Sequence, residues 1–145
     1  MNENFVAFQE KFKVEEFKIY ESKFWIWSLR PVHNTLGAGI LSLKRYTESF
    51  SDISEEEGSD LALIVKVIER ALKVNFTYDR INYLMLMMVD PHLHYHVIPR
   101  YSIEQEFDGQ KFKDEGWPKL PQLTAPNFSS ETLHKIKDLL IKSSK

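Results

Sequence analysis

The chain of 145 residues contains no cysteine. This absence excludes disulfide bonds, zinc sites built on thiolates and enzymes that use a cysteine nucleophile. A long hydrophobic run is also lacking, because the most apolar stretch, residues 83–89, is far shorter than the roughly 20 residues that span a bilayer. We therefore expect no membrane partner, and residues 83–89 are predicted to form part of a buried strand.

An excess of positive charge is missing as well. The chain has 19 Lys and Arg against 21 Asp and Glu, which gives a formal net charge of -2. Since binding to duplex nucleic acid or to anionic membranes usually needs a basic surface, we expect neither as a partner. The first five residues lack the basic region and apolar stretch of an export signal, which favours a cytoplasmic location.

The length of the chain predicts one domain over residues 1–145. Residues 101–128 show no clear period and form either an ordered wrap or a mobile arm. Strands are predicted at residues 17–20, 24–29, 40–43, 81–89 and 92–98, the fourth being covered on both faces and joined to the fifth by a tight break at Asp90-Pro91.

Three helices accompany these strands. Phe5, Phe8 and Phe12 recur at helical spacing, which indicates a short helix for packing or subunit contact. Ser54-Glu55-Glu56-Glu57 has the spacing of a capping box, so we expect a long helix from there to about residue 75. Ser129 or Ser130 is suited to cap a last helix, in which Glu131 and Lys135 form an i,i+4 pair.

Three of the five histidines alternate with apolar residues in the sequence His92-Leu93-His94-Tyr95-His96-Val97. Because successive side chains of a strand point to opposite faces, the three imidazoles are predicted to leave one face as a row that opens on a cleft. Histidines of this kind can serve as structural residues, as zinc ligands or as catalytic groups.

The spacing of side chains along a strand distinguishes zinc ligands from catalytic groups. Same-face residues of a strand lie about 6.7 Å apart, whereas the nitrogens of one zinc shell lie about 3.3 Å apart. A single zinc ion could therefore take two of the histidines, with His33 or Asp90 as a further ligand, but not easily all three. We expect no metal and no other cofactor.

Nucleophilic catalysis suits the row better. A neutral imidazole attacks phosphorus and forms a phosphoramidate that water later cleaves. The middle residue, His94, has a histidine on either side, so one neighbour is available for phosphate oxygens and another for the leaving group. By position, His94 is the predicted nucleophile.

The segment from His92 to Ile98 resembles the signature of the histidine triad family, His-φ-His-φ-His-φ-φ with φ apolar. The order of the predicted elements over residues 17–101 is similar to the family as well, so the resemblance implies a core at about 17–101 and a C-terminal extension at 102–145. The resemblance implies an α+β fold with an antiparallel sheet of about five strands and a homodimer. It also implies metal-independent hydrolysis or transfer at the alpha phosphate of nucleotides, such as dinucleoside polyphosphates or nucleoside phosphoramidates.

The resemblance also assigns roles by position. It makes His94 the nucleophile, His96 a phosphate contact that assists the leaving group, and His92 a support for orientation and phosphate binding. Ser28 stands at the ribose-binding position. Ile26, between two tryptophans, either walls a base pocket or belongs to the core. Arg100 either neutralises distal phosphates or is paired with a carboxylate, and His33 is a further candidate for substrate contact.

One segment differs from the family pattern. Family members usually approach the triad through a loop with Gly, Gln and Ser or Thr, whereas this chain has Met87-Met88-Val89-Asp90-Pro91. The difference leaves a second hypothesis open, a nucleotide-binding module that has kept the fold and has little or no turnover.

Overall fold

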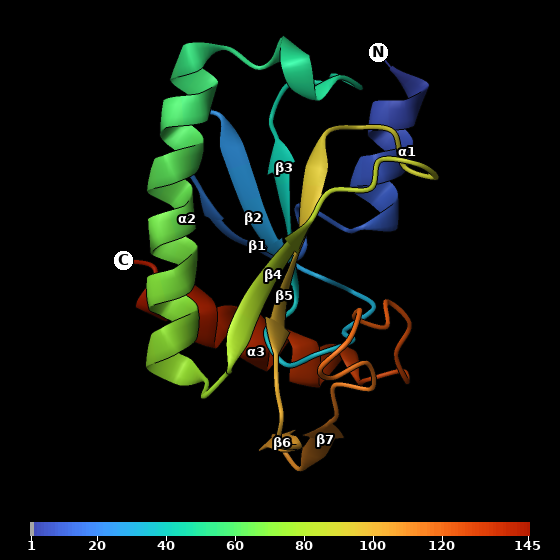
Figure 1. Ribbon diagram of the computed structural model, residues 1–145, viewed down its shortest axis with the longest axis vertical. Coiled ribbons are helices and arrows are strands. Elements are labelled where there is room, and N and C mark those ends of the chain that lie inside the picture. Colours follow the sequence, from blue (N-terminus) through green and yellow to red (C-terminus); the bar gives the residue numbers. More distant parts are fainter. Residues whose placement is uncertain (1) are drawn as a thin grey trace.

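The computed structural model describes residues 2–145 and has a five-stranded antiparallel sheet at its centre, with the strand order β1-β2-β3-β5-β4. α2 and α3 cover one face of the sheet and α1 lies over the other (Figure 1). The predicted α+β architecture is confirmed. The elements are α1 (Glu3–Lys11), β1 (Lys18–Glu21), β2 (Trp25–Leu29), β3 (Gly39–Leu43), α2 (Glu55–Asn75), β4 (Arg80–Leu84), β5 (His94–Arg100), β6 (Gln105–Phe107), β7 (Gln110–Phe112) and α3 (Ser130–Ser143), with a 3-10 turn at Phe50–Asp52.

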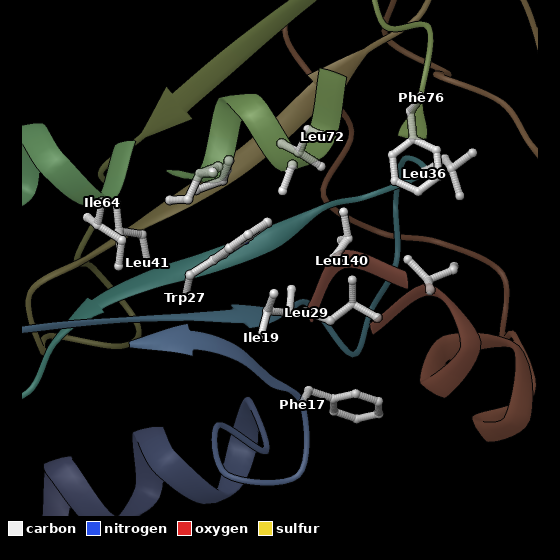
Figure 2. Packing of buried hydrophobic residues seen from close by; sticks show 14 of the residues in the cluster. Phe17, Ile19, Trp27, Leu29, Leu36, Leu41, Ile64, Leu72, Phe76 and Leu140 are labelled. Atoms are coloured by element: carbon white, nitrogen blue, oxygen red, sulfur yellow. The ribbon is translucent and has the colours of Figure 1, made fainter. Parts of the chain in front are cut away.

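The main core fills the space between the sheet and the two helices α2 and α3. Trp27 of β2 points toward α2, where Ile64 and Leu72 meet it, and Leu140 of α3 belongs to the same cluster (Figure 2). These side chains are 0% exposed. Each contributes roughly 1.5–3 kcal/mol through its removal from water, so this face supplies most of the stability.

The long helix α2 begins as the sequence predicts. The Ser54 side chain accepts a hydrogen bond from the backbone N–H of Glu57 at 3.0 Å, and the Glu57 carboxylate accepts one from the Ser54 N–H at 2.8 Å. This capping box satisfies two amides that have no partner within the helix. Glu57 also binds Arg45, with 2.7 Å between Nε and Oε2, which fixes the start of α2 beside the end of β3.

The second face of the sheet is covered by α1, whose first amides are capped by Asn2. Phe8 and Phe12 of this helix, together with Val14, form a small cluster with Ile26 of β2 and Ile40 of β3. The packing role predicted for the N-terminal helix is therefore confirmed. The same helix lies beside the loop that follows β4 (Figure 1).

The prediction for residues 81–89 is wrong in two respects. β4 ends at Leu84, and its residues are half-buried rather than covered on both faces, because β4 is an edge strand. Residues 85–93 form a loop instead of a tight break, and Met88 and Val89 are 84% and 85% exposed. An apolar run carries no mark of where pairing with a neighbour stops, so the sequence alone did not reveal this boundary.

Of the two alternatives for residues 101–128, the structure has the ordered wrap. They start with the β6–β7 hairpin, whose turn residues Asp108 and Gly109 have φ angles of 53° and 72°, as a two-residue hairpin turn requires. Further along, the Gln122 carbonyl accepts a hydrogen bond from the Asn34 side chain at 2.9 Å. The last helix, α3, is capped by Ser129 as predicted.

None of the helices in residues 2–145 combines the length and the apolar character needed to cross a bilayer.

Gly39 provides a test of how closely β2 and β3 pack. A Cβ at this position would lie 2.7 Å from the Trp27 Nε1 and 2.9 Å from the Ser28 carbonyl oxygen. Gly39→Ala is therefore expected to lower the free energy of unfolding by about 1–3 kcal/mol, measured by urea denaturation. Gly58→Ala is the matched control, since its added Cβ meets nothing within 4 Å and a helical Gly-to-Ala change adds about 1 kcal/mol. Equal stability of the two variants would contradict this account of the packing.

Candidate functional site

The histidine row lies where β5 pairs with β3. His94 is opposite Ser42 and His96 is opposite Ile40, so both rings project from the face that α1 covers. Their ring centroids are 5.1 Å apart. His92 precedes β5, and its ring continues the row against the same helix. The alternation in the sequence thus placed the three imidazoles on one face.

The histidine row was predicted to open on a cleft along its length. Instead, α1 packs on most of it. The ring of Phe8 lies 4.9 Å from the rings of both His92 and His94, and Phe12 lies 5.8 Å from His94 and 6.1 Å from His96. The exposed fractions of the three histidines are 0%, 1% and 6% in chain order. Access to the imidazoles is therefore confined to one side.

That side is a cavity of about 320 Å³ bounded by His94 and His96. Its other walls are the end of α1, the turn after β2, the loop after β4 and Leu123 of the C-terminal extension, contributing residues 11–12, 30–32, 86–90 and 123. At its edge Val32, Leu86, Met88 and Val89 are between 47% and 85% exposed. The cavity is within the size range of small-molecule sites.

A backbone hydrogen bond fixes the tautomer that we assign to His94. Its Nδ1 lies 2.6 Å from the carbonyl oxygen of His92, and a carbonyl can only accept. Nδ1 therefore carries the proton, and the lone pair of the neutral ring is on Nε2. This is the arrangement that a nucleophilic imidazole needs.

His92 does not reach the cavity. Its ring is enclosed by Phe5, Phe8 and Tyr46, and its Nε2 lies 2.8 Å from the Leu43 carbonyl oxygen. The predicted contact between this side chain and phosphate is therefore corrected, because its ring is packed away from the cavity. His92 acts on His94 through its backbone carbonyl instead.

Three charged residues line the cavity, namely Lys11, Arg30 and Asp90. Lys11 at the end of α1 pairs with Asp90 of the loop after β4, with 2.8 Å between nitrogen and oxygen. Arg30, at the end of β2, is 7% exposed and lines the cavity beside the two histidines. No motif of the sequence points to Arg30. The available signal was an arginine placed directly after a strand that is apolar except for Ser28 and before Pro31.

Four predicted substrate contacts lie outside the cavity lining. Ser28 and Ile26 are on the same face as the histidines but beneath α1, where Ile26 packs against Phe8 and Phe12. They do not face the cavity because the N-terminal helix covers their strand. Trp25 and Trp27, which flank Ile26, belong to the core on the other face.

The prediction that His33 contacts the substrate is corrected for a different reason. Both of its ring nitrogens already have hydrogen-bond partners. Nδ1 lies 3.1 Å from the Arg30 carbonyl oxygen, and Nε2 accepts the Gly37 N–H at 2.9 Å. Burial lowers the pKa of His33 to about 4, so the ring is neutral at pH 7. His33 holds the turn between β2 and β3.

Arg100 lies at the far end of β5, away from the triad cavity. Its Nε is 2.7 Å from Asp114 Oδ2, and its other nitrogens donate to Asn82 and to the Lys119 carbonyl. Of the two alternatives for this arginine, the structure favours the carboxylate-paired one. The prediction that it neutralises distal phosphates is wrong for this geometry, because its guanidinium is engaged by the C-terminal extension.

The environment keeps the cavity histidines uncharged. Burial lowers the pKa of His94. Burial, followed by the nearby positive charge of Arg30, lowers the pKa of His96 to about 4. Both rings are therefore neutral at pH 7, the state in which an imidazole nitrogen attacks phosphorus.

The zinc hypothesis finds no support from neighbouring ligands. Across residues 2–145, His, Cys, Asp and Glu side chains do not gather in any group of three that could hold a metal ion.

The lowered pKa of His96 predicts how stability depends on pH. The unfolded chain takes up a proton on this residue below its ordinary pKa of 6.5, whereas the folded protein does so only near 4. The free energy of unfolding should thus fall as the pH drops from about 6.5 toward 4, by at most roughly 1.4 kcal/mol per pH unit for this group.

His96→Gln should reduce this dependence, because glutamine does not titrate, while His33, whose pKa is also lowered to about 4, keeps its own contribution. Urea denaturation at a series of pH values measures both proteins, and an unchanged slope in the variant would rule out His96 as a contributor.

The comparison with known proteins agrees with the geometry. Residues 39–103 match the family model described as HIT domain. Among solved structures, a histidine triad protein from Bradyrhizobium japonicum has 17% sequence identity and a TM-score of 0.68, with 92% of this chain and 95% of that chain covered. A hypothetical histidine triad nucleotide-binding protein from Sulfolobus tokodaii has 20% identity and a TM-score of 0.64, with 88% and 83% covered.

None of the curated protein sequences matches the chain. The matched residues 39–103 include β3, α2, β4, β5 and all three histidines of the signature. The part of the chain that contains the histidine row is therefore similar to the HIT domain, and the whole chain has the fold of the histidine triad proteins.

Proposed function

We propose that the protein is a nucleotide hydrolase or transferase that acts at the alpha phosphate through a nucleotidyl intermediate on His94. The observation that carries this proposal is the hydrogen bond of 2.6 Å from the His94 Nδ1–H to the His92 carbonyl, which leaves the Nε2 lone pair on a ring that bounds the cavity. Dinucleoside polyphosphates and nucleoside phosphoramidates are the proposed substrates.

In the first step the Nε2 lone pair forms a bond to the alpha phosphorus. The bond from phosphorus to the bridging oxygen or nitrogen breaks, and the leaving group keeps its electron pair and receives a proton. His96, whose ring is 5.1 Å from that of His94, is placed to bind a phosphoryl oxygen as the neutral ring. It can donate the proton to the leaving group only as an imidazolium, after taking up a proton together with the anionic substrate, because the neutral ring is not an acid. The Nδ1–H remains bound to the His92 carbonyl and steadies the imidazolium.

In the second step water attacks the same phosphorus. The bond between phosphorus and Nε2 breaks, the electron pair returns to the ring, and one proton of the water replaces the proton lost in the first step. One water molecule is consumed for each bond cleaved. A transferase differs only in that another nucleophile takes the place of water.

The second candidate is a nucleotide-binding module without turnover. The burial of the His94 ring under Phe8 and Phe12, which leaves it 1% exposed, favours this candidate because in-line attack needs room at Nε2. Binding of AMP measured by calorimetry, without product from any nucleotide substrate, would identify such a module.

The labelling of His94 tests the enzymatic proposal. Purified protein is mixed with nucleotides labelled at the alpha phosphate, quenched, and examined for an acid-labile label on His94. Wild-type protein should carry the label, whereas His94→Asn should carry none and should lose turnover by roughly 10⁴-fold or more, because asparagine has no nucleophilic nitrogen.

His134→Asn provides the matched control, since this histidine lies on α3 and stacks on Phe17 outside the cavity. It should keep both label and turnover. A label that persists in His94→Asn would refute the assignment of the nucleophile, and the absence of adduct and product with every substrate would refute the enzymatic proposal.

A further inference from the structure

Arg30 has an unusual place for a charged residue. It follows the last residue of β2, a strand that is buried along its whole length, and it is itself only 7% exposed. Its side chain lines the triad cavity together with His94 and His96. A full positive charge is thus held in a low-dielectric site beside the proposed nucleophile.

The contacts of Arg30 hold the guanidinium without neutralising it. Nη1 donates to the Val32 carbonyl at 2.7 Å, to the Asn34 side-chain oxygen at 3.1 Å and to the Leu123 carbonyl at 2.8 Å. All three acceptors are uncharged. The buried Nε has no hydrogen-bond partner within residues 2–145, and the ion pairs of that part of the chain do not include Arg30.

The other buried arginine, Arg100, has a carboxylate partner of the kind that Arg30 lacks. Arg100, which is 4% exposed, has the Asp114 carboxylate 2.7 Å from its Nε. A buried charge is costly unless an opposite charge accompanies it, which is why such groups are normally paired. Asp114 neutralises the charge of Arg100, whereas no carboxylate of residues 2–145 is paired with Arg30. An anionic ligand in the cavity would therefore be attracted to Arg30.

We propose that Arg30 binds the phosphoryl group of the substrate and positions it on His94. The inference rests on the proposed function for the identity of the reacting group, and it makes Arg30 the main electrostatic determinant of affinity. The guanidinium presents planar donors that fit two phosphoryl oxygens, and its anchored Nη1 fixes the direction in which the remaining N–H groups point.

Lys11 is the second cation at the cavity, and its situation differs. It is paired with Asp90 at 2.8 Å, and its side chain is 49% exposed. Its charge is balanced by the protein itself and screened by water. Phosphate specificity is therefore assigned to Arg30, and Lys11 keeps the Asp90 carboxylate occupied near the anionic ligand.

Calorimetric titration with inorganic phosphate and with AMP tests the proposal. Arg30→Gln should weaken the binding of both ligands by about 10- to 100-fold, the range expected for a lost hydrogen bond to a charged group. Arg30→Lys keeps the charge but loses the planar donors, so a smaller loss is expected. In turnover assays, Arg30→Gln should raise KM as well as lower kcat.

Two controls separate charge from structure. Asn34→Ala keeps the charge of Arg30 but removes one acceptor of its Nη1 and the hydrogen bond to the Gln122 carbonyl, so it should weaken phosphate binding less than Arg30→Gln does. Arg70→Gln removes a positive charge from an exposed position of α2 and should change nothing. Circular dichroism before each titration confirms that the variants are folded.

The possible results distinguish this inference from the proposed function. If the label forms on His94 and Arg30→Gln binds phosphate and AMP as wild type does, the role of Arg30 is overturned while the enzyme stands. If no label forms but binding depends on Arg30, the anion site stands and the enzymatic proposal falls. If Arg30→Gln does not fold, binding by Arg30→Lys equal to that of wild type overturns the inference.

Discussion

The packing of α1 on the histidine row is the constraint on which the site depends. Phe8 and Phe12 remove the imidazoles from water, and this burial is the first cause of the lowered pKa values of His94 and His96. A neutral ring keeps its lone pair at pH 7, so the helix that restricts access also sustains the nucleophilic state. The same packing leaves only the cavity side for a ligand.

The orientation of the row depends on the register between β3 and β5. Ser42 lies opposite His94 and Ile40 opposite His96, so both histidines share the α1 face, whereas Tyr95 and Val97 turn toward α2 and α3. A slip by one residue would turn the imidazoles into the main core. The buried leucines and tryptophans of the opposite face prevent such a slip, because they would have to exchange places with polar groups.

Local patterns predicted much of this structure. The alternation of His92, His94 and His96 placed the rings on one face, and Ser54 with Glu57 gave the start of α2. Each signal lies within a few residues of what it predicts. The end of β4 and the cover that α1 provides had no such local sign, because both depend on which distant segment packs against them.

The two buried arginines also show that a sequence pattern does not predict contacts with distant segments. Arg100 follows the triad signature and so attracted a functional assignment, but Asp114 binds it from a segment whose position the sequence did not specify. Arg30 stands 93 residues from Leu123, whose carbonyl it binds, and 66 residues from His96, beside which it lies. Whether an arginine is neutralised is decided by long-range contacts of this kind, and the sequence contains only the candidates.

Most of the strand side chains with a buried polar atom that lacks a hydrogen-bond partner in residues 2–145 lie on the α1 face of the sheet, and Trp27, with its Nε1, is the exception on the other face. Among the buried side-chain atoms without a hydrogen-bond partner in residues 2–145 are the hydroxyls of Ser28 and Ser42, the Nδ1 atoms of His92 and His96, and Nε of Arg30. The residues on strands among these point to the α1 face, and Arg30 and His96 border the cavity. Each such group costs about 1–3 kcal/mol in a folded protein. The face packed by α2 and α3 has the hydrophobic burial to offset that cost, so the fold tolerates a polar, partly unsatisfied layer where the proposed chemistry requires one.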